Sequence, residues 1–161
     1  MVEDSPGLIT PLPGQAFILK LIEMISQVKY SLDIIQYQWN FYPGKPESLM
    51  QRLNRTVLAQ AEAGKKIRVL LNKEGRAQHL MAVNMKAARY LGEAGIRTKF
   101  GRTFPITHAK LWIFDDDSVI LGSHNLSGRS VSVNNEASAL IKCREVAVEF
   151  KRYFNAIWDL I

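Results

Sequence analysis

Helix-like and strand-like segments alternate along the chain before Pro105. Apolar residues recur at helical spacing in three segments, which begin at Gln15, Pro46 and Gln78 and end near Val28, Gly64 and Glu93. Each segment is followed by a short run typical of a strand, at Ser31–Gln36, Lys66–Leu71 and Ile96–Phe100. Because a helix between successive strands allows those strands to run parallel, the pattern predicts an α/β fold with a largely parallel core.

The pattern changes after Pro105, where strand-like runs follow one another closely. These runs lie at His108–Phe114, Val119–Leu121 and Glu136–Ile141, with a turn-like connection at residues 115–118. Short connections suit antiparallel pairing, so we expect a mixed sheet with antiparallel strands at one edge. An amphipathic helix begins at Arg144. We therefore predict a single domain over residues 15–161, preceded by an N-terminal extension over residues 1–14.

The charge balance favours a polyanionic partner. The 161 residues include 21 Lys and Arg against 15 Asp and Glu, which gives a net charge of +6 and a pI near 9.5. Nucleic acid and an anionic membrane surface both match this charge, although many basic proteins bind neither. Cys143 is the sole cysteine, and the acidic, proline-broken start has no secretory-signal pattern. We therefore expect a cytoplasmic protein without an internal disulfide.

His108 and Lys110 are the most informative pair of polar residues in the chain. Alternate side chains of an extended segment share a face, so these two can address the same ligand. Asp115 has the opposite parity and lies at the end of the same run. We expect Asp115 to support backbone or a neighbouring side chain.

A second motif lies at Gly122–Asn125. Alternation pairs Ser123 with Asn125 and turns His124 away, which favours a packing or surface role for His124. The three histidines and single cysteine of the chain have no metal-ligand spacing, and no Walker-type phosphate loop is present.

The two motifs resemble the His-x-Lys-x4-Asp and Gly-Ser-x-Asn signatures of the phospholipase D superfamily. His108, Lys110 and Asp115 match the first signature, and residues 122–125 match the second. The helix–strand units, the Asn134–Glu136 segment and the aromatic last helix are similar to the small bacterial nucleases of that superfamily. The resemblance implies a phospholipase D-like α-β-α fold, in which a mixed sheet is sandwiched between helices. Because the chain holds one copy of the motif, it also implies a homodimer in which His108 of both protomers meets at the active site.

The resemblance further implies phosphodiester cleavage without a metal or any other cofactor. One His108 attacks phosphorus to form a phosphohistidine, while the other protonates the leaving oxygen and later activates water. Lys110 and Asn125 would hold the non-bridging oxygens, and Ser123 would add a contact to phosphate or backbone. Glu136 would accept a hydrogen bond from the histidine, fix its tautomer and raise its pKa.

The motif leaves the substrate open, because the superfamily includes nucleases, phospholipases and phosphatidyltransferases. Loops after two predicted strands, together with two arginines near the motif, supply candidate substrate contacts at Trp39, Lys73, Arg76, Arg102 and Arg129. The alternative is that Trp39 and its aromatic neighbours fill a gap in the core, and that the cationic side chains are ordinary solvated charges.

We therefore predict a metal-independent, sequence-nonspecific endonuclease that acts as a homodimer on DNA, with RNA left open and no obligatory membrane association. A phospholipase D-type enzyme acting on phospholipid is the first alternative, although no clear amphipathic insertion accompanies the motif. The second is a nucleic-acid-binding module without turnover, which the complete motif disfavours.

Overall fold

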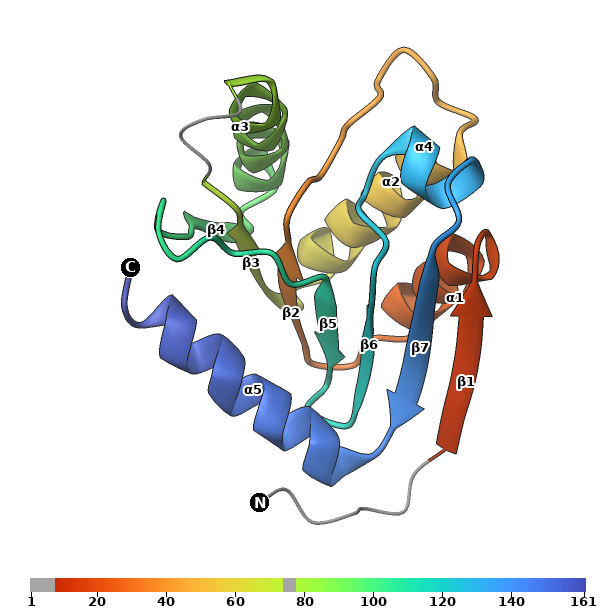
Figure 1. Cartoon of the computed structure of the whole chain (residues 1–161), viewed down its shortest axis with the longest axis vertical. Helices are drawn as coiled ribbons and strands as arrows, with labels where there is room; N and C mark the ends of the chain where they lie inside the picture. The colour runs from red at the N-terminus through yellow and green to blue at the C-terminus, as the bar shows by residue number, and fades with distance from the viewer. Residues whose placement is uncertain (1–7, 74–77) are drawn as a thin grey trace.

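The computed structural model describes residues 8–73 and 78–161. Within these residues seven strands form one sheet in the order β1-β7-β6-β5-β2-β3-β4, with helices on both faces (Figure 1). The strands are β1 (Leu8–Pro13), β2 (Ser31–Gln36), β3 (Lys66–Leu71), β4 (Arg97–Phe100), β5 (Leu111–Phe114), β6 (Ser118–Gly122) and β7 (Ala137–Lys142). The helices are α1 (Ala16–Ser26), α2 (Leu49–Glu62), α3 (Gln78–Glu93), α4 (Gly128–Ser132) and α5 (Arg144–Trp158). The predicted mixed sheet between helices is confirmed.

The parallel half of the sheet consists of β2, β3 and β4, joined by crossovers through α2 and α3. The structure gives β2, β3 and α3 the bounds that the sequence predicts. Helix α2 begins later than predicted, because Ser48 is its N-cap and accepts a hydrogen bond from the Gln51 N–H at 3.2 Å. The predicted parallel core is therefore present at this side of the sheet.

The other half of the sheet is antiparallel, as predicted. Strand β5 pairs with β2 and with β6, and β7 pairs with β6. Asp115 and Asp116 make the β5–β6 turn with φ values of 52° and 54°, a left-handed conformation that Asp tolerates better than most residues. Strand β5 begins at Leu111 and not at His108, since the Thr107 N–H bonds to the Asn72 side-chain oxygen at 3.0 Å and holds the preceding chain outside the ladder.

The N-terminal boundary of the domain needs correction. The predicted boundary leaves residues 1–14 outside the domain, whereas Leu8–Pro13 form β1, an edge strand paired with β7. The Gly14 N–H then donates to the Glu136 carbonyl at 3.0 Å. Two prolines obscured this strand in the sequence, but proline is tolerated at a sheet edge, where an N–H group faces solvent.

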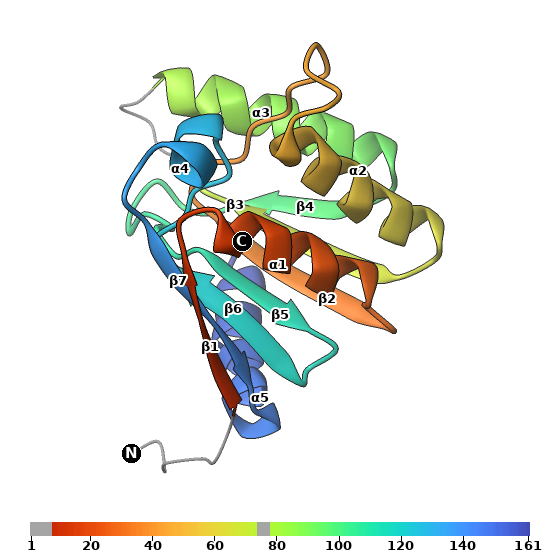
Figure 2. The same cartoon turned by 90° about the vertical axis from the view of Figure 1, so that its right-hand side faces the viewer.

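Two hydrophobic clusters lie on opposite faces of the sheet. Helices α1, α2 and α3 cover one face, and α5 covers part of the other (Figure 2). Trp112 and Phe114 pack into the first cluster, while Leu111 and Ile113 pack into the second. This alternation confirms the two faces predicted for the segment that follows His108.

An ion cluster attaches α5 to the sheet. Asp33 is 2% exposed and accepts two hydrogen bonds from the Arg68 guanidinium, at 2.6 and 3.0 Å, and also pairs with Lys151. Burial acts to lower the pKa of Lys151, but its bonds to Asp116 and Asp33 outweigh burial and raise that pKa. The buried carboxylate is thus fully paired, as a buried charge must be.

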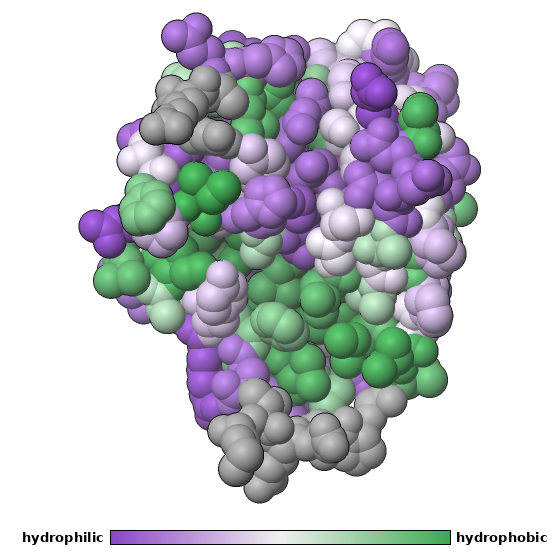
Figure 3. Space-filling view, viewed as in Figure 1, coloured by the Kyte–Doolittle hydropathy of each residue, from purple (hydrophilic) through white to green (hydrophobic). Residues whose placement is uncertain are grey.

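The face that carries α5 is only partly covered. Ile9 of β1 is 63% exposed beside the half-buried Ile141 of β7. Figure 3 shows hydrophobic residues over the part of this face where Figure 1 places β6, β7 and β1. Among the described residues no helix is both long and apolar enough to cross a membrane.

Candidate active site

The motif residues gather at one edge of the sheet. Parallel strands β2 and β3 end at this edge, the antiparallel β5 and β7 begin there, and β6 ends there. The segments that carry the predicted site residues therefore meet although they are far apart in sequence. These residues are His108 and Lys110 before β5, Ser123 and Asn125 after β6, and Glu136 before β7.

His108 and Lys110, which the sequence predicts to share a face, are in contact. Lys110 Nζ donates to the His108 carbonyl at 2.7 Å and lies 3.3 Å from each ring nitrogen of His108. The imidazole is exposed, whereas Lys110 is 9% exposed. Burial lowers the pKa of Lys110, and the Glu136 carboxylate opposes this effect. The site thus presents an accessible imidazole next to a cation with little access to water.

Tyr37 is a site residue that sequence analysis missed. Its ring centroid lies 4.6 Å from that of His108 in an edge-on arrangement and 4.9 Å from Lys110 Nζ. The ring thereby restricts both side chains through an aromatic and a cation–π contact. Its position directly after β2, at the edge where ligands collect in α/β sheets, was the available signal.

Glu136 is held by hydroxyl and amide donors. The Ser123 and Ser130 hydroxyls donate to its two carboxylate oxygens, the Ser130 bond at 2.9 Å, and Asn134 Nδ2 lies 3.3 Å from one of them. Partial burial acts to raise the pKa of Glu136, but these hydrogen bonds outweigh it and lower the pKa. A direct bond from His108 to Glu136, which the resemblance implies, stays a prediction.

Asn125 is oriented by the same serine. Its backbone N–H donates to Ser130 Oγ at 2.9 Å, and the Ser130 hydroxyl donates onward to Glu136. The side-chain oxygen of Asn125 is buried and has no hydrogen-bond partner among the described residues. The NH₂ group of an amide donates hydrogen bonds, so it is this group, and not the buried oxygen, that would contact a phosphate.

Asp115 does not belong to the site. It lies at the opposite end of β5, where its carboxylate accepts hydrogen bonds from the N–H groups of Lys29, Tyr30 and Ser31 at 2.9, 2.7 and 3.0 Å. The expected support of backbone is confirmed, but a place for Asp115 among the catalytic residues is wrong. In the folded chain this motif position fixes the entry to β2 and the β5–β6 turn.

His124 has the packing role that its parity predicts. It is 0% exposed, and its ring stacks on Phe17 with centroids 4.2 Å apart. Nε2 lies 3.0 Å from the Gly14 carbonyl, which can only accept, so Nε2 carries the proton and Nδ1 accepts from Ser138 Oγ at 2.7 Å. Burial lowers the pKa of His124.

The five residues predicted to contact substrate outside the motifs have different outcomes. Trp39 is 0% exposed and its Nε1–H donates to Asn54 Oδ1 at 2.8 Å, so its proposed contact with substrate is wrong and the core alternative is correct. Lys73, Arg102 and Arg129 are exposed and remain candidates. Arg76 lies outside the described residues.

A buried asparagine in α3 supports the loops beneath the site. Asn84 Oδ1 accepts from the Trp39 N–H at 3.0 Å, and Nδ2 donates to the carbonyls of Tyr37 and Asn72 at 2.9 and 3.0 Å. Asn72 in turn bonds the Thr107 N–H, directly before His108. One amide therefore joins the segments after β2 and β3 to the segment that carries His108.

Asn84→Ala should destabilise the fold by about 2–4 kcal/mol, because it leaves three buried backbone groups without a partner. Urea unfolding followed by fluorescence measures the loss. Met85→Ala, at a 57% exposed position on the same helix, is the control. A loss no larger than that of the control would contradict the supporting role.

Glu136→Gln should make stability less dependent on acid pH. A carboxyl whose folded-state pKa is lowered stabilises the protein above its unfolded pKa, and this contribution is lost as pH falls through the folded pKa. The difference in Tm between wild type and variant should therefore be widest near neutral pH and shrink below pH 4.5, the ordinary value for Glu. Melting curves test this, with the exposed Glu62→Gln as control. A Tm difference that stays constant across this range would refute it.

The described part of the chain, residues 8–73 and 78–161, contains no group of three or more His, Cys, Asp or Glu side chains arranged to hold a metal ion. The functional groups gathered at the sheet edge are an imidazole, an ammonium, an amide, a hydroxyl and a carboxylate. Together they offer one nucleophile and several donors to a single anionic centre.

Known proteins share this sequence pattern and fold. A family model described as "Cardiolipin synthase, PLD-like domain" matches residues 21–158. The virion nicking-joining enzyme of vaccinia virus is 23% identical over 86% of this chain and 32% of that protein. The 5'-3' exonuclease PLD3 of Xenopus laevis is 28% identical over 99% of this chain and 33% of that protein. The chain thus spans about a third of the length of these curated relatives.

A solved structure of similar size has the same fold. The phospholipase D family member Nuc from Salmonella typhimurium superposes with a TM-score of 0.77, and the match covers 97% of this chain and 95% of that one. The two sequences are 21% identical, so this likeness concerns the fold alone.

Proposed function

The chain belongs to the family of phospholipase D-like domains, and from this premise we propose that it is a phosphodiester hydrolase that cuts nucleic acid. The contact of buried Lys110 Nζ with the exposed imidazole of His108 carries the proposal. Two curated relatives are named as a nicking-joining enzyme and an exonuclease. The net charge of +6 supports the same substrate class.

In the proposed reaction a nitrogen of His108 attacks phosphorus and the bond to the leaving oxygen breaks, so that a phosphohistidine forms. Lys110 and Asn125 stabilise the charge on the non-bridging oxygens, while Ser123, whose hydroxyl hydrogen is used in its bond to Glu136, holds that carboxylate in place. The leaving oxygen takes a proton from an acid on the opposite side of phosphorus. That same group then removes a proton from the water that releases the product.

The acid is proposed to be His108 of a second copy. Within one chain His124 is unsuited, because it is fully buried with both ring nitrogens bonded. Two apolar side chains beside the nucleophile, Phe104 at 85% and Ile106 at 46% exposure, offer surface for a twofold contact. On dilution, specific activity should fall in parallel with the dimer fraction measured by sedimentation. Full activity in a monomer would reject the shared site.

Cleavage is proposed to need no metal, since Lys110 and Asn125 supply positive charge and donors at the phosphate. The test is incubation in excess EDTA with single-stranded DNA, duplex DNA, RNA, and anionic or choline phospholipid vesicles. We expect the nucleic acids to be cut without a base preference and the lipid headgroups to stay attached. Headgroup release with intact nucleic acid would favour the lipid enzyme that the family description suggests, and binding without turnover would favour a binding module.

A further inference from the structure

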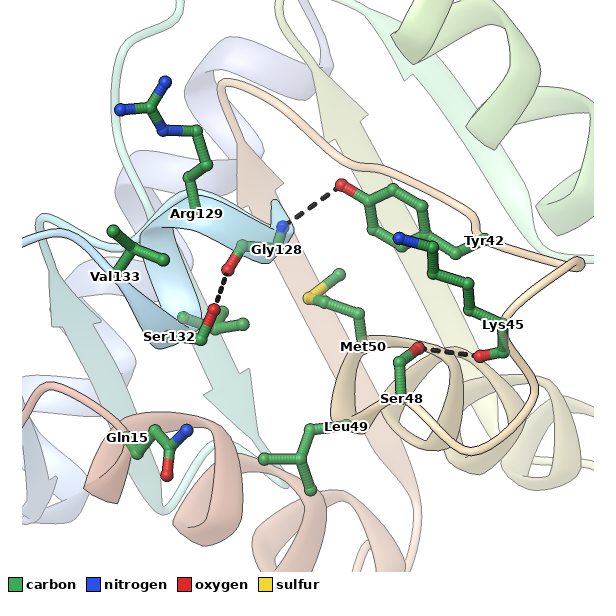
Figure 4. Close-up of a pocket in the computed structure, with 11 residues that line it drawn as sticks. Gln15, Tyr42, Lys45, Ser48, Leu49, Met50, Gly128, Arg129, Ser132 and Val133 are labelled. Carbon is green, nitrogen blue, oxygen red and sulfur yellow. Dashed lines mark hydrogen bonds between the residues drawn. The ribbon is translucent and has the colours of Figure 1, made fainter.

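A cavity of about 530 Å³ lies between α4, the loop before α2 and the start of α2 (Figure 4). Its apolar surface comes from Leu49, Met50, Val131 and Val133. Such a volume falls in the range of small-molecule sites. No residue of the proposed catalytic mechanism lines it.

Tyr42 forms one wall of the cavity, and hydrogen bonds hold both its side-chain hydroxyl and its backbone N–H. Its hydroxyl accepts a hydrogen bond from the Gly128 N–H at 3.1 Å, and its own N–H donates to Gln51 Oε1 at 3.0 Å. Figure 4 shows the ring standing opposite α4, with Met50 between them. The cavity therefore presents a flat aromatic side chain that is already ordered before a ligand enters.

Two cations flank this apolar space from opposite walls. Lys45 comes from the loop before α2, and Arg129 comes from α4. Both are exposed, and neither side chain has a hydrogen bond or ion pair with any described residue. The other hydroxyls at the wall are already used, since Ser48 donates to the Lys45 carbonyl and Ser132 to the Gly128 carbonyl. The unpaired charges at the rim thus favour an occupant that combines a flat or apolar body with negative charge.

The segments that form the cavity are bonded to segments that lead to the candidate active site. Backbone bonds at 2.8 and 2.9 Å join Leu126 to Asn40 and Gln38, which lead into the Tyr42 loop. In α4, Ser130 is turned to Asn125 and Glu136, while its neighbours Arg129 and Val131 line the cavity. The cavity and the predicted phosphate ligand Asn125 thus border the same five-residue helix.

We propose that this cavity binds a nucleobase next to the scissile phosphate, unstacked from its neighbours, while Lys45 and Arg129 contact the flanking phosphates. The proposal rests on the proposed nuclease function and adds that single-stranded or locally opened nucleic acid is cut faster than closed duplex. The rigid Tyr42 ring and the compact volume favour a base over a long acyl chain.

Val133→Trp tests the proposal by filling the cavity from an exposed position, where Val133 is 69% exposed. The control is Tyr153→Trp on α5, at a position 49% exposed on the opposite face of the sheet. Substrates are single-stranded oligothymidylate, the same oligomer with an abasic site beside the cut, and bis(4-nitrophenyl) phosphate. Val133→Trp should lower kcat/KM for oligothymidylate by at least about fivefold, in line with the loss of one stacked base.

Hydrolysis of bis(4-nitrophenyl) phosphate should be unchanged in both variants, and the abasic oligomer should be cut equally by wild type and Val133→Trp. Equal cleavage of oligothymidylate by wild type and Val133→Trp would overturn the base site while leaving the nuclease function intact. Turnover of none of the three substrates by wild type would instead overturn the nuclease function.

Thymidine monophosphate titrated into His108→Asn gives a readout independent of turnover. Binding that Val133→Trp abolishes in that background supports the base site. Absence of nucleotide binding, with phosphatidylglycerol vesicles bound in a Val133-dependent way, would overturn it in favour of a lipid.

Discussion

His108→Asn is expected to lower the rate of phosphodiester cleavage by more than about 10³-fold, because it removes the group that forms the covalent intermediate. The imidazole is exposed, and asparagine is a smaller polar residue, so the change leaves no large cavity in the core. The Tm and the dimer fraction should therefore stay close to those of wild type. Initial rates on single-stranded DNA in EDTA measure the effect.

The matched control is His79→Asn, which changes an exposed histidine at the start of α3. Its rate should equal that of wild type, since the second imidazole is assigned to the partner copy. A rate for His108→Asn within tenfold of wild type would remove the assigned nucleophile. Loss of activity in His79→Asn would indicate that the general acid is His79 of the same chain and not His108 of the partner copy.

Lys110→Met is expected to lower kcat by about 10²–10³-fold, the usual cost of removing one donor that stabilises charge in a transition state. Nζ touches both ring nitrogens of His108 and is largely shielded from water, which strengthens its effect on a bound phosphate. Lys20→Met, at a partly exposed lysine paired with Glu23 on α1, is the control and should keep the wild-type rate.

Deprotonation of Lys110 should produce the fall in cleavage rate at alkaline pH. Burial lowers its pKa below the ordinary 10.5, so the cation should be lost, and the rate should fall, at a lower pH than for a solvated lysine. Arginine keeps its charge throughout this range, so Lys110→Arg should be slower at its optimum but lack that limb. An unchanged limb in Lys110→Arg would show that another group titrates there.

The sequence predicts those elements whose stability is encoded locally. Strands β2 and β3 are six-residue runs that contain three and four Leu, Ile or Val residues, and their predicted bounds match the structure. Alternation places His108 and Lys110 on one face and turns His124 away from it, but it leaves open whether His124 is buried or lies at the surface.

The errors concern residues whose place depends on tertiary contacts. Trp39 resembles an exposed loop aromatic until Asn54 and Leu126, from distant segments, enclose it. Strand β1 contains prolines and is stable only because β7 offers an edge. Helix α4 has five residues and no apolar period, so its N-cap at Ser127 was the sole local signal.

Membership of a motif likewise does not show whether a residue lies in the candidate active site. Asp115 matches the family signature, yet it lies at the end of β5 opposite the site, where it accepts hydrogen bonds from the backbone N–H groups of residues 29–31. Tyr37 belongs to no motif but contacts both His108 and Lys110. A signature identifies residues that occur together in a family, whereas contact with the reacting atoms must be read from the fold.

The most direct test is to trap the covalent intermediate in EDTA. A DNA strand labelled with radioactive phosphorus at the scissile phosphate is mixed with the enzyme, and the reaction is stopped with alkali during turnover. We expect label bound to wild-type protein, stable in alkali, released by acid and absent from His108→Asn. Rapid cleavage with no protein-bound label at any time would contradict nucleophilic attack by His108.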